Sequence, residues 1–399
     1  MDALRDPFAP GAGTPPPDLV GREQVLQSAL VALQRARAGR PAKSVILIGL
    51  RGVGKTVLLD RIRQDAEATG IHAIRLEAPE NRSLPALLAP QLRQTLLRLS
   101  QTETAKALAI RGLRALAGFA KGLKVKYGDI EVGIDHEPEP GLADNGDLEH
   151  DLQALMEQVG LAAQAADTAL ALFIDELQYV PEEQLAALIT ALHRVAQRRL
   201  PVVMAGAGLP QLRGQMGDAK SYAERLFDFP FIGPLTPDEA RQAIERPLAS
   251  EGVQIEEAAL QQIVHITRGY PYFLQTWGQQ AWLAAKQSPI TLQDVERATV
   301  MAIASLDEGF FRVRFDRCTP KERRYLRAMA ELGEGPHRSG DIADCLGQKV
   351  SSLAPTRSTL IAKGMVWSPT HGDTAFTVPM FDAFMKRIMP GDGWRDAAA

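Results

Sequence analysis

The sequence predicts an α/β fold with a doubly wound parallel sheet, followed by a helical region and a small C-terminal unit. Continuous apolar runs of strand length alternate with amphipathic helical stretches up to residue 235. Residues 236–316 then show helical periodicity only, and residues 317–390 combine three short helices with a strand pair. Strands that alternate with helices pair in parallel, because each crossover helix returns the chain to the same end of the sheet.

Composition narrows the class of protein without deciding its function. The chain has 399 residues, more than one compact core accommodates, and its net charge is −3. That charge argues against a surface that is basic all round, but it allows a local basic face for nucleic acid. Two cysteines, Cys318 and Cys345, without a C-x-x-C spacing predict no zinc site and a reducing, cytoplasmic compartment. No apolar stretch approaches the roughly 18 residues of a membrane span, so we expect no membrane contact.

The predicted core follows an N-terminal segment, residues 1–18, for which we expect disorder because it is rich in proline and glycine. A helix is expected over residues 21–37, where Leu26, Leu30 and Leu33 recur at helical spacing. Apolar runs predict strands at residues 44–50, 71–78, 169–180, 201–208 and 227–235. Their continuous rather than alternating pattern is typical of strands buried on both faces. Helical patterns between the strands begin at residues 56, 84 and 181.

Residues 101–150 look like an insertion into this core. A helix is expected over residues 109–123, and the stretch after it alternates apolar and polar residues around a Gly-Asp pair at 128–129, which predicts a hairpin. The acidic stretch 135–147 could hold a metal or be a solvated loop, although its spacing fits no calcium loop.

The most specific motif lies between the first strand and the next helix. The stretch GLRGVGKT fits G-x-x-x-x-G-K-[ST] in full, in a strand-to-helix context that a chance glycine-rich turn would not share. Glycines let backbone N–H groups surround a polyphosphate, and the helix directs its positive end at the same point. Lys55 adds a charge on the β- and γ-phosphates, and Thr56 offers a hydroxyl to Mg²⁺. The residues predicted to hold the nucleotide are Gly49, Gly52, Val53, Gly54, Lys55, Thr56 and Val57.

The run LFIDE ends a later strand with two carboxylates. Asp175, at the carboxyl end of that strand, can hold Mg²⁺ through water, and Glu176 can orient and deprotonate an attacking water. An Asp-Glu pair after a strand can also be a plain helix cap. Because this pair follows a complete phosphate loop, we expect a Mg²⁺-dependent ATPase that forms ADP and phosphate, with Lys55 and Glu176 as catalytic residues.

With these residues in place, the sequence resembles the AAA+ superfamily of P-loop NTPases over roughly residues 18–388. It is most similar to the branch that holds the origin-recognition initiators and to the neighbouring STAND-type ATPases. The resemblance implies an α/β ATPase core over residues 19–235, a helical lid over 236–316, a winged-helix domain over 317–390 and a tail, 391–399. It also implies ATP and Mg²⁺ as cofactors, and a homo-oligomer or a protein partner.

Three further residues gain a role only through this resemblance. The stretch LVGREQVL places Arg22 in a box that these families set beside the adenine. Pro271 ends a Gly-Tyr-Pro stretch that is similar to a nucleotide-touching G-x-P element. Arg225 stands ahead of the last strand, where an arginine finger often reaches a neighbour's γ-phosphate, or it is a plain surface arginine.

The chain departs from the family pattern at two positions. Residues 205–208, Ala-Gly-Ala-Gly, end a strand where relatives carry a polar sensor, and Tyr272 stands where initiators carry a lid arginine. Gln178 is either a substitute sensor or a solvated residue at a helix start. Both departures imply either slower hydrolysis or a sensor placed elsewhere, and together they favour a conformational switch with slow turnover over a processive motor.

The last unit resembles the winged-helix domain of the initiators. Helices are expected over residues 319–333, 339–347 and 351–364, with a strand pair over 365–378. In that fold the third helix enters the major groove of DNA. Residues 317–399 hold 12 Lys and Arg against 9 Asp and Glu, a mildly basic balance of +3. The polar candidates on the third helix are Ser351, Ser352, Thr356, Arg357, Thr359 and Lys363.

Two functions fit the sequence best. One is an ATP-dependent switch whose nucleotide state controls assembly and the binding of double-stranded DNA by residues 317–390. The other is a STAND-like signalling or defence ATPase that assembles with a protein partner and whose winged helix does not bind DNA. A nucleotide-binding scaffold with little turnover is a third interpretation.

Overall fold

The computed structural model describes residues 1–11, 13–78, 83–124, 126–127, 133 and 136–395. The chain divides into two compact units. Unit 1 comprises Met1–Gly21, Gly49–Gly54 and Ile232–Ala399, and unit 2 comprises Arg22–Ile48 and Lys55–Phe231. The hairpin expected around residues 128–129 lies outside the described residues. Within the described ranges, no helix has both the length and the apolar character that a bilayer crossing requires.

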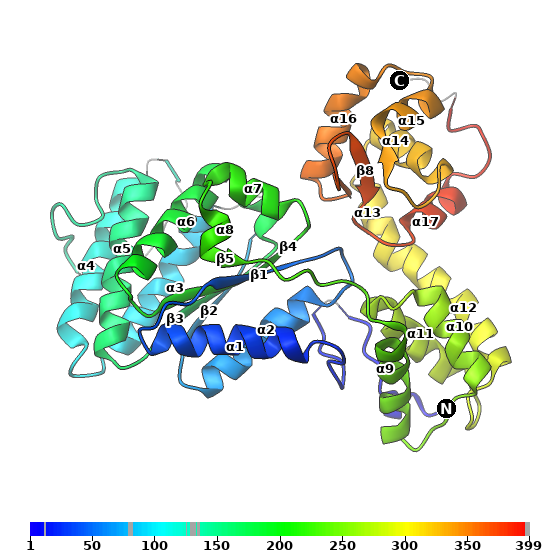
Figure 1. The fold of residues 1–399 in the computed structure, drawn as a ribbon, viewed down its shortest axis with the longest axis horizontal. Coiled ribbons are helices and arrows are strands. Elements are labelled where there is room, and N and C mark those ends of the chain that lie inside the picture. The colour runs from blue at the N-terminus through cyan, green and yellow to red at the C-terminus, as the bar shows by residue number, and fades with distance from the viewer. Residues whose placement is uncertain (12, 79–82, 125, 128–132, 134–135, 396–399) are drawn as a thin grey trace. The chain divides into compact units, whose positions relative to one another are not determined.

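Unit 2 is built on a five-stranded sheet in which all neighbouring strands are parallel (Figure 1). The strand order is β2-β3-β4-β1-β5. The strands are β1 (Ser44–Ile48), β2 (His72–Glu77), β3 (Leu170–Asp175), β4 (Val202–Gly208) and β5 (Phe227–Asp228). Every residue of β1, β3 and β4 is buried, which explains why their sequences are continuous apolar runs. The predicted α/β class with a doubly wound parallel sheet is confirmed.

Helices cover both faces of this sheet, with α1 and α2 along one face and α5 and α6 along the other (Figure 1). The helices of unit 2 are α1 (Glu23–Arg37), α2 (Lys55–Ala68), α3 (Leu84–Leu99), α4 (Lys106–Leu123), α5 (Leu148–Ala165), α6 (Glu182–Gln197), α7 (Leu212–Ala219) and α8 (Ala223–Leu226). Because all the strands run the same way, their carboxyl ends share one edge of the sheet, where ligands of such folds bind.

Helix α5 is absent from the sequence prediction, because the stretch before it has the composition of an acidic loop. The carboxylates there serve the helix itself. Asp147 caps it by accepting the N–H of His150 at 2.8 Å. The fully buried Asp151 accepts the N–H of Gly146 at 2.8 Å. Across the described residues, no group of three or more potential metal ligands comes together.

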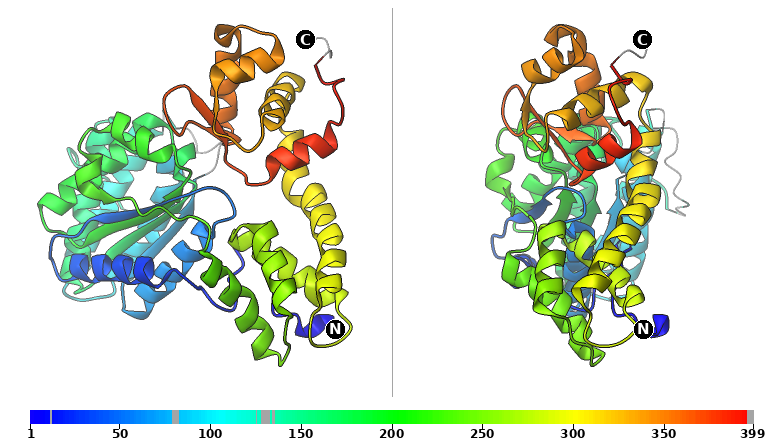
Figure 2. Two further views of the ribbon diagram at one scale, coloured as in Figure 1. Left: turned by 45° about the vertical axis from the view of Figure 1, so that its right-hand side comes forward. Right: turned by 90° about the vertical axis from the view of Figure 1, so that its right-hand side faces the viewer.

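The part of unit 1 that follows the sheet is helical. Its helices are α9 (Pro237–Ser250), α10 (Glu257–Thr267), α11 (Pro271–Ala284), α12 (Leu292–Ser305) and α13 (Arg312–Asp316). A π-helical stretch, Leu306–Phe311, joins α12 to α13, so that one long rod leads into the C-terminal region (Figure 2).

The N-terminal segment lies against α11 within unit 1. The ring of Phe8 is 4% exposed and reaches within 2.5 Å of the point where a Cβ on Gly278 would lie. The indole N–H of Trp282 donates to the carbonyl of Asp2 at 2.8 Å. The sequence predicts disorder for residues 1–18, whereas the structure packs Asp2 and Phe8 against α11, because an apolar ring fills a slot that a glycine leaves open.

The C-terminal region combines helices with a three-stranded antiparallel sheet of order β6-β8-β7. In chain order the elements are α14 (Pro320–Glu331), β6 (His337–Arg338), α15 (Ser339–Leu346), α16 (Val350–Ala362), β7 (Val366–Trp367), β8 (Asp373–Phe376) and α17 (Phe381–Ile388). Strand β6 and helix α17 are additions to the sequence prediction. Phe384 of α17 stacks on Phe311 with ring centroids 5.2 Å apart, so this region shares a core with the rod before it.

Candidate nucleotide-binding site

A hydrogen-bonded pair of oxygen side chains, one buried and one half-buried, lies at the carboxyl end of β3 in unit 2. The hydroxyl of Thr56, near the start of α2, donates to Oδ2 of Asp175 at 2.6 Å. The other carboxylate oxygen of Asp175 accepts the N–H of Glu176 at 2.8 Å. Asp175 is 7% exposed. The fold therefore brings together the two residues that the sequence predicts as metal ligands.

Burial raises the pKa of Asp175 above its usual value, while the hydrogen bond from Thr56 opposes this rise. The charge of Glu176 raises this pKa further, and the charge of Lys55 lowers it. A buried carboxylate with a raised pKa beside a hydroxyl is a site that a cation stabilises. Carboxylate and hydroxyl oxygens are hard ligands, so the residues present fit Mg²⁺, which binds through few protein oxygens.

Lys55 is the first residue of α2 and is 9% exposed. A buried ammonium group at a helix start adds to the positive end of the helix dipole, which creates a strong preference for an anion at that point. Thr56 and Val57 are half-buried and continue the first turn of the helix. Unit 2 thus supplies the positively charged start of α2 and, at the edge of the sheet, the carboxylate of Asp175.

Glu176 has a left-handed backbone, with φ 53° and ψ 36°, which is uncommon for a residue with a side chain. It precedes a 3₁₀ turn, η2 (Leu177–Tyr179). Nε2 of Gln178 donates to Oε2 of Glu176, and Oε1 of Gln178 accepts the N–H of Leu209 at 3.1 Å. Gln178 is 8% exposed. The interpretation of Gln178 as a solvated residue is therefore wrong.

The glycines of the phosphate loop, residues 49–54, are required by the backbone. Gly52 and Gly54 have φ values of 79° and 88°, which disfavour any residue with a Cβ. A Cβ on Gly49 would lie 2.2 Å from the carbonyl oxygen of Ile232. Val53 is 1% exposed, so its side chain serves packing, and only its backbone can serve a ligand.

Within unit 1, two backbone hydrogen bonds join this loop to segments far away in the sequence. The N–H of Tyr272 donates to the carbonyl of Gly52 at 3.1 Å, and the N–H of Arg51 donates to the carbonyl of Thr377 at 3.0 Å. Tyr272 directly follows Pro271, the first residue of α11. From the sequence, Tyr272 was noted only because it stands where relatives carry an arginine, and Thr377 was not noted at all. Backbone hydrogen bonds do not depend on the side chain, so they leave no pattern in the sequence.

The two arginines that the family resemblance singled out belong to unit 2. Arg22 is the half-buried N-cap residue of α1, and its carbonyl accepts the N–H of Leu26 at 3.0 Å. Arg225 lies on the short helix α8 and is exposed. Within the part of the chain that the structure describes, no hydrogen bond or ion pair holds the Arg225 guanidinium.

Comparisons with known proteins agree with this geometry. A family model described as AAA ATPase domain matches residues 18–204, and one described as a domain of unknown function (DUF8462) matches residues 308–385. The Walker-type ATPase PABY2304 of Pyrococcus abyssi is similar with 16% identity and a TM-score of 0.57, covering 94% of this chain and 97% of that chain. No curated protein gives a significant match.

Two further solved structures are less similar. The Aeropyrum pernix Orc1 protein, in complex with DNA, has 16% identity and a TM-score of 0.47, covering 93% of this chain and 94% of that chain. The RuvB Holliday junction branch migration motor of Thermotoga maritima has 17% identity and a TM-score of 0.44, covering 91% and 94%. The match to the AAA model and the parallel sheet together show that residues 18–204 are an AAA ATPase domain with the P-loop NTPase fold.

Proposed function

We propose that this chain is a molecular switch that binds ATP with Mg²⁺ and hydrolyses it slowly to ADP and phosphate. The observation that carries the proposal is the hydrogen bond between Thr56 and the buried Asp175, because it joins the end of the phosphate loop to the end of β3. Both residues are hard oxygen ligands, and burial together with the charge of Glu176 raises the pKa of Asp175, which a bound cation would offset.

In this proposal each residue has a defined task. Mg²⁺, when bound, neutralises phosphate charge as it develops during the reaction. Lys55 holds phosphate oxygens by its charge, and the backbone N–H groups of residues 52–57 surround them. Glu176 orients the attacking water and accepts its proton. Arg22 and Pro271 contribute to nucleotide binding, and Arg225 reaches the γ-phosphate of a neighbouring copy.

Slow turnover and a switching role follow from what surrounds the loop. Strand β4 carries no polar side chain, and Tyr272 replaces an arginine in the lid. The bonds from Tyr272 and to Thr377 tie the loop backbone to the helical and C-terminal parts of unit 1. A change in the loop on nucleotide binding therefore acts directly on both parts, whereas little in the site is specialised for rapid hydrolysis.

The test combines turnover, binding and particle size. We expect the Glu176→Gln variant to lose ATP turnover by roughly 10²- to 10⁴-fold, the usual contribution of a general base, while it binds ATP as the wild type does. Light scattering of the wild type should show a larger particle with ATP than without it. Equal turnover in the variant and the wild type would show that Glu176 takes no part in hydrolysis. An unchanged particle size would show that ATP does not drive assembly.

We further propose that the C-terminal region is a winged helix that works through protein contacts rather than by reading DNA. Its order of helix, strand, two helices and strand pair supports the fold. The exposed residues of α16 are Val350, Ser351, Ser352, Ala354, Pro355, Ser358, Thr359 and Ala362. None of them is Lys or Arg, whose phosphate contacts dominate the affinity of proteins for DNA.

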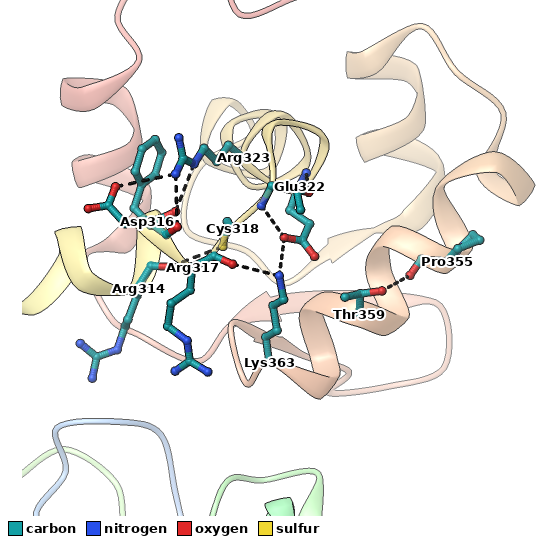
Figure 3. Close-up of polar contacts among 11 residues, drawn as sticks. Arg314, Asp316, Arg317, Cys318, Glu322, Arg323, Pro355, Thr359 and Lys363 are labelled. Carbon is teal, nitrogen blue, oxygen red and sulfur yellow. Dashed lines mark hydrogen bonds and ion pairs between the residues drawn. The ribbon is translucent and has the colours of Figure 1, made fainter. Parts of the chain in front are cut away.

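Arg357 of α16 and Lys363 at its C-cap are instead bonded inside the domain. Lys363 donates to Oε2 of Glu322 and to the carbonyl of Arg317, and the hydroxyl of Thr359 turns back to the carbonyl of Pro355 (Figure 3). Arg357 donates to Thr374, Ser368 and the carbonyl of Asp373, each at 2.8 Å. The helix therefore presents an uncharged face, which favours the second function that the sequence allowed.

A labelled DNA duplex at low and moderate salt, with and without ATP, decides between the two functions. We expect little change in anisotropy under either condition, because Val350–Ala362 present no exposed cation and the N-cap adds only Lys349. Salt-dependent binding that is weakened in Lys349→Ala, at the exposed N-cap of α16, with a salt slope reduced by about one, would restore the DNA hypothesis.

A further inference from the structure

Gln178 is a buried amide to which the proposed reaction assigns no task. It lies on η2, two residues after Glu176, and is 8% exposed. Both ends of its side-chain amide are engaged. The nitrogen donates to the Glu176 carboxylate, and the oxygen accepts the N–H of Leu209 at 3.1 Å, just after β4. A buried amide with both ends bonded is costly to displace, so it fixes whatever it bonds to.

Strand β4 is shaped to admit this turn. A Cβ on Gly206 would lie 2.4 Å from Cδ1 of Leu177, and a Cβ on Gly208 would lie 2.9 Å from Oε1 of Gln178. Neither glycine has a positive φ, so conformation does not require it. The close approach of η2 to the strand requires glycine at both positions, because a side chain there would push η2 away from β4. The absence of a polar side chain at the end of β4 is therefore the condition for burying Gln178 there.

The bond to Glu176 adds no charge to the site. An amide donor orients a carboxylate through one hydrogen bond, whereas Lys or Arg would also neutralise it as a proton acceptor. The backbone of Glu176 is strained in the left-handed region, and such strain persists only where neighbours hold it. The hydrogen bond from Gln178 holds the side chain of Glu176 in place.

We propose that Gln178 is a positioning residue that holds the Glu176 carboxylate in one orientation and couples it to the end of β4. It thereby replaces the polar side chain that β4 lacks. The inference rests on the proposed role of Glu176 in ATP hydrolysis. Leu209 opens the segment that leads through α7 to α8, where Arg225 is exposed, so this segment is joined to Glu176 by the two hydrogen bonds of Gln178.

The first test separates orientation from packing. In Gln178→Ala we expect kcat for Mg²⁺-ATP to fall roughly ten- to a hundredfold, as misplaced catalytic groups do, with KM and ATP affinity little changed. Gln178→Glu can still accept the N–H of Leu209 but has no donor for Glu176, so we expect the same loss. If Gln178→Glu turns ATP over at the wild-type rate, Gln178 serves only to pack η2 on β4, and the proposal fails.

Gln184 provides a matched control. It is also a buried glutamine, 7% exposed, and its carbonyl accepts the N–H of Leu84 at 2.7 Å. It lies on α6 and bonds a different element. We expect Gln184→Ala to lower thermal stability without a selective loss of kcat. A loss of kcat in Gln184→Ala equal to that in Gln178→Ala would show that any buried amide in this unit has the same effect, and would overturn the proposal.

The double variant Glu176→Gln/Gln178→Ala tests whether Gln178 acts through Glu176. We expect turnover equal to that of Glu176→Gln alone, because residues that act as a unit are not additive. Losses that multiply would mean that Gln178 acts independently of the carboxylate. If Glu176→Gln itself retains wild-type turnover, the proposed role of Glu176 fails. If it loses turnover while Gln178→Ala does not, only the role of Gln178 fails.

Discussion

Two groups of polar side chains that the sequence singled out differ in what they bond to. At the end of β3, Thr56 and Asp175 bond each other from different elements, and the resulting pair fits a ligand. On α16, Arg357 and Lys363 bond their own domain and leave an uncharged outer face. Polar side chains therefore form a candidate site in one region and a structural frame in the other. The difference is that Asp175 is an anion at the carboxyl edge of a parallel sheet, where ligands bind, whereas Arg357 and Lys363 are cations whose bonds hold their own domain together.

The largest effect expected from this comparison is on catalysis at the β3 edge. Thr56→Val removes a hydroxyl that bonds Asp175 and that we propose binds Mg²⁺. We expect Mg²⁺-dependent ATP turnover to fall by about 10- to 100-fold, as loss of groups around a metal does. Thr69→Val is the control, because its hydroxyl bonds the carbonyl of Ala66, at 2.8 Å, within its own stretch of chain. Equal turnover in both variants would mean that the Thr56–Asp175 pair is also only structural.

The second effect is on stability in the C-terminal region. Arg357→Ala removes three hydrogen bonds that join α16 to β8 and the turn before it. We expect the free energy of unfolding to fall by about 2–4 kcal/mol, since bonds to a charged group are the stronger ones. Chemical denaturation measures this change. Arg338→Ala, at an exposed position before α15, should stay within about 0.5 kcal/mol, and a similar loss there would refute the framework role of Arg357.

The third effect concerns pH. Burial acts to raise the pKa of Glu322, but hydrogen bonds from Lys363 and the backbone of Thr319 outweigh it, and the pKa lies below the usual 4.5. A depressed folded-state pKa gives stability that is present above pH 4.5 and is lost as the pH falls through the folded value. We expect denaturation curves of the wild type to show this loss below that pH.

Removal of the lysine isolates this contribution. Lys363→Met should cost about 1–3 kcal/mol near neutral pH, because it leaves the buried Glu322 without its charged donor, and it should flatten the loss at low pH. Lys349→Met, at an exposed lysine, should keep the wild-type pH dependence. If the Lys363→Met curve parallels the wild-type curve, the ion pair does not control this part of the stability.

The smallest effect is expected on the outer face of α16. Ser358→Ala changes an exposed side chain and should alter the free energy of unfolding by no more than about 0.5 kcal/mol, with ATP turnover unchanged. A clear loss of stability would show that this face is also part of the framework. Size-exclusion profiles with ATP would reveal whether the same face takes part in assembly.

Much of the core was predictable because its signals are local. The apolar runs gave β1, β3 and β4 because strands buried on both faces need no polar residue. Helix α5 was missed because its start lies in an acidic loop, where Asp147 is the N-cap and Asp151 bonds the N–H of Gly146 before the helix. The sequence predicted a longer strand at the place of β5 and no strand at the place of β6, because a two-residue strand has no periodicity to detect.

The sequence by itself determined the chemistry that depends on residue type and spacing. Gly52 and Gly54 need positive φ, Lys55 must open a helix after them, and Asp175 must end a buried strand, so a linear pattern suffices. Only the tertiary structure decided which partners the long polar side chains bond. Gln178, Arg357 and Lys363 could each face solvent or turn inward, and that choice depends on donors and acceptors brought from distant segments. A hydrogen bond across the fold is completed by packing, which no short stretch of sequence contains.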